Sequence, residues 1–74
     1  MGGIEVKFER FEIYVNGKYK TEVDAANAEM VYRGWGCFLH PQTPVTIVNK
    51  QTRESRTFTR QLDNAGNLLR IITH

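Results

Sequence analysis

The feature that most constrains the fold is an alternation of apolar and polar residues that leads into an Asn-Gly pair. Between residues 4 and 15 (IEVKFERFEIYV) the apolar side chains recur mostly at every second position: Ile4, Val6, Phe8, Phe11, Ile13 and Val15. A period of two is typical of a β-strand with one buried face. Asn16-Gly17 is a strong signal for a tight hairpin turn, which predicts a return strand over residues 18–23. The chain is therefore expected to fold around an antiparallel sheet.

The details of this hairpin involve two competing rules. The alternation changes phase between Phe8 and Phe11, so we expect a bulge or a break near Glu9 and Arg10. A two-residue Asn-Gly loop would pair Val15 with Lys18 and bring charged side chains beside the apolar face. A loop one residue longer would pair Val15 with Tyr19, Ile13 with Thr21 and Phe11 with Val23. Because burial of one face normally fixes the register, we expect the longer loop.

The rest of the chain predicts one helix and three further strands. Residues 24–33 are the helix candidate, with Asp24 as N-cap and Gly34 as the glycine that follows the helix. Its apolar face would consist of Ala28, Val31, Tyr32 and Trp35, with Met30 beside it. Residues 34–44 read as a loop that contains two prolines, and Trp35, Phe38 and Leu39 in it would either cover the core or form a contact surface. Strands are expected over 45–49, 56–62 and 68–73.

These elements define one small domain. The order β-β-α-β-β-β predicts an α+β fold over residues 1–74, in which one short helix packs on an antiparallel sheet of four to five strands. The chain has 74 residues and a single cysteine, so no intrachain disulfide can support its small core. Residues 1–10 lack the apolar run of a signal peptide, and no apolar run approaches the length of a membrane span. We therefore expect a cytoplasmic protein that does not enter a membrane.

Catalytic and metal-binding chemistry finds little support. Cys37 and His40 lie three residues apart in the loop, but they lack a third catalytic group and a second pair of zinc ligands. Glu5, Glu9 and Glu12 are expected at outward or bulge positions of the first strand, and helix capping accounts for Asp24. The sequence therefore predicts no enzyme activity, no catalytic residue, no metal site and no cofactor.

Charge is distributed unevenly along the chain. Residues 1–32 contain four Lys/Arg and six Asp/Glu (−2), whereas residues 33–74 contain six Lys/Arg and two Asp/Glu (+4). One predicted hairpin holds most of the excess, and its candidate binding residues are Lys50, Arg53, Arg56, Phe58 and Arg60. Arg56, Phe58 and Arg60 share a strand face, and arginines so placed bind phosphates or carboxylates. The alternative is an ordinary solvated strand face around one buried phenylalanine.

Three aromatic residues are candidates for base stacking or for an interface: Tyr14, Tyr19 and Trp35. Tyrosine, tryptophan and arginine are enriched at the centres of protein interfaces. Packing in the core is the alternative for Trp35.

The segments FEIYVNGKYKTEV, DAANAEMVYRGW and PVTIVNKQTRESRTFTR give the chain a layout that resembles small bacteriophage-encoded accessory proteins of the anti-CRISPR type. The resemblance covers most of the chain in size and element order, and it provides no shared motif from which a functional residue could be transferred. It implies a non-catalytic inhibitor that docks on a protein or ribonucleoprotein complex in the host cytoplasm. Direct binding of DNA or RNA phosphates by the basic hairpin is the alternative function, and a homodimer formed through edge strands or the 35–39 loop is a third hypothesis.

Overall fold

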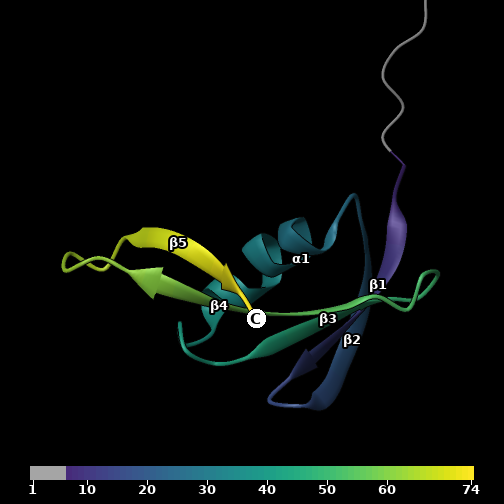
Figure 1. Cartoon of the computed structure of the whole chain (residues 1–74), viewed down its shortest axis with the longest axis horizontal. Helices are drawn as coiled ribbons and strands as arrows, with labels where there is room; N and C mark the ends of the chain where they lie inside the picture. Colours follow the sequence, from purple (N-terminus) through teal and green to yellow (C-terminus); the bar gives the residue numbers. More distant parts are fainter. Residues whose placement is uncertain (1–6) are drawn as a thin grey trace, which may run out of the picture.

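The computed structural model describes residues 7–74, the side chain of Cys37 excepted, and forms a single sheet with one helix on it (Figure 1). The strands are β1 (Glu9–Val15), β2 (Lys18–Ala25), β3 (Val45–Asn49), β4 (Ser55–Leu62) and β5 (Leu68–Thr73), and between β2 and β3 lie α1 (Ala28–Trp35) and the 3₁₀ turn η1 (Gly36–Phe38). All pairings are antiparallel, in the spatial order β2-β1-β3-β4-β5. The predicted α+β fold and element order are confirmed.

The β1–β2 hairpin satisfies both of the competing rules. Asn16 and Gly17 have φ angles of 52° and 79°, as a tight type I′ turn requires, and Val15 pairs with Lys18. The predicted longer loop is therefore wrong. A register shift beside Ile13 leaves one extra residue on β2, so that Ile13 pairs with Thr21 and the expected apolar face is restored.

The phase change near Glu9 corresponds to the start of β1. Glu9 and Arg10 pair regularly with Ala25 and Asp24, without a bulge, and Phe8 precedes the strand as an exposed side chain. The expected strand positions Ile4 and Val6 lie outside the described residues.

The helix begins later than the sequence indicated. Asn27 is the N-cap, because its side-chain Oδ1 accepts a hydrogen bond from the Met30 amide at 2.9 Å. The prediction of Asp24 as N-cap is wrong, since pairing with β1 extends β2 to Ala25 and places Asp24 beside Arg10. The predicted end of the helix at Gly34 is also wrong, because the helix continues through Gly34 to Trp35. Gly36 is the C-cap, and a Cβ added there would overlap the ring of Tyr32.

The core lies between α1 and one face of the sheet. Its buried side chains are Phe11, Ile13, Val31, Tyr32, Val45, Ile47 and Phe58. The Tyr32 and Phe58 rings stack with their centroids 5.3 Å apart, which joins the helix to β4. The large apolar residues of segment 35–39 were expected either to cover the core or to form a contact surface. Trp35 and Leu39 pack against the core, whereas Phe38 is 87% exposed.

Candidate functional site

The residues of the predicted basic hairpin occupy different environments. Phe58 is only 1% exposed and belongs to the core, as the solvated-face alternative required. The Arg60 guanidinium donates from Nη1 to the Gly36 carbonyl at 2.7 Å and from Nη2 to the Leu39 carbonyl at 2.6 Å. Arg60 therefore fixes η1 and the following loop onto β4, and the structure gives these two residues supporting roles.

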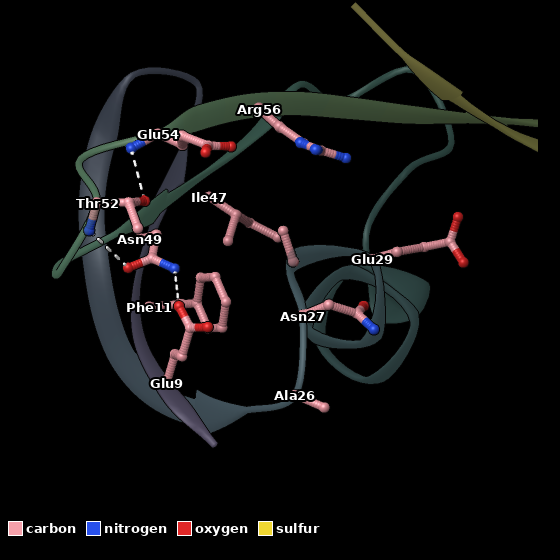
Figure 2. A pocket seen from close by; sticks show the side chains of 11 residues that line it. Glu9, Phe11, Ala26, Asn27, Glu29, Ile47, Asn49, Thr52, Glu54 and Arg56 are labelled. Carbon is pink, nitrogen blue, oxygen red and sulfur yellow. Dashed lines mark hydrogen bonds between the residues drawn. The ribbon is translucent and has the colours of Figure 1, made fainter. Parts of the chain in front are cut away.

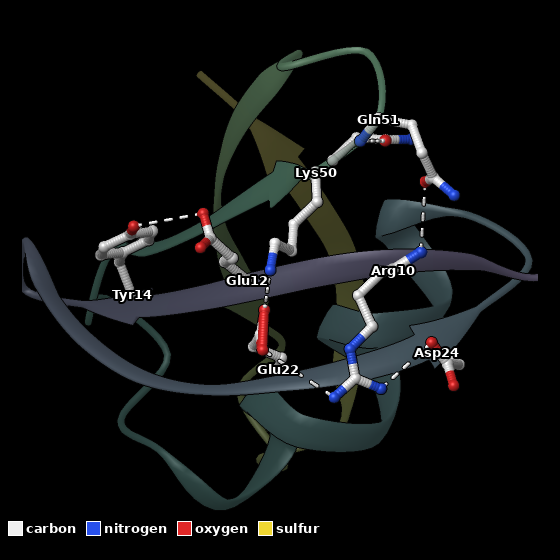
Figure 3. Close-up of polar contacts among 8 residues, drawn as sticks. Arg10, Glu12, Tyr14, Glu22, Asp24, Lys50 and Gln51 are labelled. Atoms are coloured by element: carbon white, nitrogen blue, oxygen red, sulfur yellow. Dashed lines mark hydrogen bonds and ion pairs between the residues drawn. The ribbon is translucent and has the colours of Figure 1, made fainter.

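Lys50 lies on the opposite face of the sheet, within an ion-pair network (Figure 3). Its Nζ is 2.8 Å from Glu22 Oε2, while Arg10 is 3.2 Å from Asp24 and 3.9 Å from Glu22. The hydrogen bond from Lys50 holds the pKa of Glu22 below its ordinary value, and the same bond raises the pKa of Lys50. Lys50 and Arg10 are thus each paired with carboxylates.

The order of the strands explains why the charge division along the sequence does not persist in space. β1 lies between β2 and β3, so acidic residues of the first half adjoin basic residues of the second half. The Lys50–Glu22 pair is one such contact. The structure therefore does not form one continuous basic surface from the hairpin.

Arg56 lies at a cleft of about 460 Å³ between the start of α1 and the ends of β1, β3 and β4 (Figure 2). Ala26 and Ala28 form partly exposed apolar parts of its wall, while Phe11 and Ile47 lie beneath it and are almost fully buried. The charged residues that line the cleft are Glu9, Glu29, Glu54 and Arg56. Glu29 also pairs with Arg33 at 3.3 Å along the helix. Among residues 7–74, Arg56 forms no ion pair and its side chain is exposed. The cleft therefore offers a guanidinium, carboxylates and apolar surface together.

The β3–β4 turn at the rim of this cleft is fixed by its own hydrogen bonds. The Asn49 side chain donates to Glu9 through Nδ2, and its Oδ1 accepts from the Gln51 amide at 2.8 Å and the Thr52 amide at 3.1 Å. Thr52 in turn accepts from the Glu54 amide at 3.2 Å. Such a network holds the rim in one shape, which lowers the entropic cost of binding.

Arg53 occupies the tip of this turn. Its backbone has a φ of 65°, and its amide donates to the Asn49 carbonyl at 2.7 Å. Its side chain is exposed, so Arg53 and Arg56 are the two arginines of the predicted site that project into solvent.

The candidate aromatic residues lie away from the cleft. Tyr14 lies on the same face of the sheet as Lys50 (Figure 3). The rings of Tyr14 and Tyr19 meet edge to face, with their centroids 5.7 Å apart. Burial, followed by the nearby Glu12 carboxylate, raises the pKa of Tyr14, whose hydroxyl donates to Glu12 at 3.3 Å. Trp35 is partly buried and packs against the core. The charge of Arg53 partly offsets the rise in the Tyr14 pKa, so these two residues lie near each other, but none of the three aromatics lines the Arg56 cleft.

Sequence reasoning missed the cleft residues Asn27, Asn49, Glu9 and Glu54. Asn27 could have been found, since it is an N-cap residue type immediately before a helical pattern. Glu9 and Asn49 become neighbours only through the pairing of β1 with β3, in which Phe11 lies opposite Asn49. No local pattern reports that pairing.

The described residues include neither a cluster of metal-binding side chains nor a membrane-spanning helix. Within residues 7–74, no group of three or more His, Cys, Asp or Glu side chains could hold a metal ion. None of the described helices is both long and apolar enough to cross a membrane. Comparisons with family models, curated proteins and solved structures found no match to this chain.

Proposed function

We propose that this chain is a non-catalytic binding protein that docks on a larger protein or ribonucleoprotein complex, with the Arg56 cleft as its contact site. The observation that carries the proposal is the combination in this cleft of an exposed guanidinium, carboxylates and apolar wall residues. A volume of about 460 Å³ is in the range of pockets that hold small ligands, so it suits a few side chains of a partner segment.

The cleft chemistry favours a polypeptide of mixed charge. The Arg56 fork can make two parallel hydrogen bonds to a carboxylate of the partner. Glu54, which forms no ion pair among the described residues, can pair with a lysine or arginine of the same segment. Ala26 and Ala28, which are partly exposed at the cleft, can contact an apolar side chain of the partner. The fixed turn at the rim would limit the cost of ordering this site.

Nucleic-acid binding is the alternative function, and the two exposed arginines of the hairpin favour it. The carboxylates around Arg56 count against it, because they repel phosphates at the point where a phosphate would have to bind. Lys50 is already engaged by Glu22. A protein surface is therefore the favoured partner.

Inhibition of a host effector complex is the finer part of the proposal. It rests on the resemblance in size and element order to anti-CRISPR proteins. Docking at the cleft would inhibit by occupying a surface that the complex needs, and it would require no catalytic residue, metal or cofactor. The proposed place of action is the host cytoplasm.

The test is a pull-down from bacterial lysate with matched charge reversals. Arg56→Glu changes the cleft, whereas Lys20→Glu makes the same change in charge at an exposed position on β2. We expect the wild type and Lys20→Glu to recover a large complex and Arg56→Glu to lose it, with all three folded by circular dichroism. Recovery of no large partner by the wild type, or retention by Arg56→Glu, would contradict the proposal.

A salt titration tests the alternative. Binding to duplex or single-stranded DNA at low salt, falling steeply toward physiological salt and weakened by Arg53→Ala and Arg56→Ala, would support direct nucleic-acid binding. Absence of binding at low salt would exclude it.

A further inference from the structure

We propose that β5 is a dimerisation edge, at which two copies of this chain pair their β5 strands antiparallel into one continuous ten-stranded sheet. β5 ends the sheet order β2-β1-β3-β4-β5, and within residues 7–74 only β4 pairs with it. This inference is independent of the proposed cleft function.

The two edges of the sheet differ in how they are protected. The sequence of β2, KYKTEVDA, has four charged residues, and charged side chains are a common protection of edge strands against pairing. The sequence of β5, LLRIIT, has one charged residue and no proline. Leu68 and Leu69 are 48% and 58% exposed. The β5 edge thus lacks most of the protection that β2 has.

The shape of the molecule also indicates that the β5 edge of the sheet is uncovered. β4 and β5 extend together to one end of the molecule, while α1 packs mainly on β2 and β3 and reaches β4 through the Tyr32–Phe58 stack (Figure 1). The radius of gyration is 13.5 Å, compared with about 11 Å for a compact domain of this length. The β4–β5 hairpin therefore has less cover than the rest of the sheet.

Backbone groups of β5 that point outward are available for a new strand. The His74 amide donates to the Thr57 carbonyl of β4 at 2.9 Å. Because the backbone groups of an antiparallel strand point alternately to its two sides, Ile72 also directs its groups to β4, and Ile71 and Thr73 direct theirs to the open edge. A second β5 strand can satisfy them.

Symmetry and charge select the register. Two identical antiparallel strands are related by a two-fold axis perpendicular to the sheet, so one residue must lie opposite its own copy. Arg70 at the axis would bring two guanidinium groups together, which is unfavourable. Ile71 at the axis gives an apolar pair, places Arg70 opposite Ile72 of the second copy, and aligns Leu69 with Thr73 of the second copy. Among these arrangements, this one pairs β5 over its greatest length without opposing like charges.

The first experiment measures mass in solution. We expect sedimentation equilibrium to give about twice the 8.6 kDa of one chain at high micromolar concentration. Thr73→Pro removes an outward N–H without removing a hydrogen bond to β4 and should yield monomer, whereas the matched Thr73→Ala keeps that N–H and should stay dimeric. A wild type that remains at 8.6 kDa up to millimolar concentration, or a dimer that survives Thr73→Pro, would overturn the proposal.

The second experiment tests the register by oxidation in a Cys37→Ser background, so that each engineered cysteine is the sole one. Ile71→Cys should form an intermolecular disulfide, because the two Cα atoms would lie about 5.5 Å apart. Arg70→Cys should not, since its copies would be offset to about 8 Å. Equal crosslinking of both variants, or crosslinking of Arg70→Cys alone, would refute this pairing even if a dimer forms through another surface.

Discussion

Replacement of Arg60 provides the sharpest test of how the structure distributes roles among the arginines. Arg56 and Arg60 are four residues apart on one strand face, and the sequence predicted a partner-binding role for both. In the structure, Arg60 makes two charge-assisted hydrogen bonds to loop carbonyls, whereas Arg56 is exposed at the cleft. Arg60→Ala should therefore affect folding, and Arg56→Ala should affect only binding.

The expected size follows from the bonds lost. Hydrogen bonds to a charged group contribute about 1.5–3 kcal/mol each, and partial exposure places these two near the lower end, so Arg60→Ala should cost about 2–4 kcal/mol. A chain of 74 residues has a free energy of unfolding of about 4–11 kcal/mol, so this loss is a large share of it. Arg56→Ala, as an exposed substitution, should change stability by less than about 0.5 kcal/mol.

The assay is urea unfolding at one protein concentration, followed by the fluorescence of Trp35, the only tryptophan. Trp35 immediately precedes η1, so it reports on the region that Arg60 fixes. We expect the Arg60→Ala midpoint to fall by roughly 1–3 M. Arg60→Lys should be intermediate, because one ammonium cannot reproduce the two-pronged contact. Equal stability of Arg60→Ala and Arg56→Ala would refute the supporting role assigned to Arg60.

Three further predictions concern single side chains. Gly36→Ala should lower stability by about 1–3 kcal/mol in the same urea assay, because its methyl group would overlap the buried ring of Tyr32. Tyr32→Phe should leave stability unchanged or raise it by up to about 1 kcal/mol, since the Tyr32 hydroxyl is buried with no hydrogen-bond partner among the described residues. The pKa of Glu22 in the folded protein is below its ordinary value of 4.5, so the ionised Glu22 stabilises the fold above that pH, and this stabilisation is lost as the pH falls through the folded pKa. The melting temperature should therefore decrease as the pH is lowered through this range. Lys50→Met should make that decrease smaller.

The parts of the fold that local patterns predicted correctly are those that local geometry controls. Strands 45–49 and 68–73 have the predicted bounds, and the buried helix face contains Val31 and Tyr32 as expected. The hairpin register was wrong at the turn because a bulge cannot be placed from alternation alone. With one extra residue on β2, the two-residue turn and the apolar face both persist.

The site was harder to predict because it depends on contacts between distant segments. From the sequence alone, Arg60 is predicted to be an exposed surface cation. In the structure η1 lies against β4, and the Gly36 and Leu39 carbonyls accept hydrogen bonds from the Arg60 guanidinium. From the sequence alone, Lys50 is predicted to be part of a basic hairpin. In the structure the order of the strands places it next to Glu22, with which it forms an ion pair. Arg56 differs from both only in what lies around it, and no local pattern reports that difference.

The proposed cleft and the proposed dimer edge lie at different ends of the sheet, which has a consequence for binding. The cleft adjoins the β3–β4 turn and the start of α1, whereas the β4–β5 hairpin reaches the other end of the molecule (Figure 1). A dimer joined at β5 would therefore leave both clefts open and carry two copies of Arg56. If the partner complex contains repeated subunits, two linked clefts would raise the overall affinity without any new contact. Thr73→Pro should then weaken capture of such a partner while leaving the affinity of a single cleft unchanged, whereas Arg56→Glu should abolish capture and leave the dimer intact.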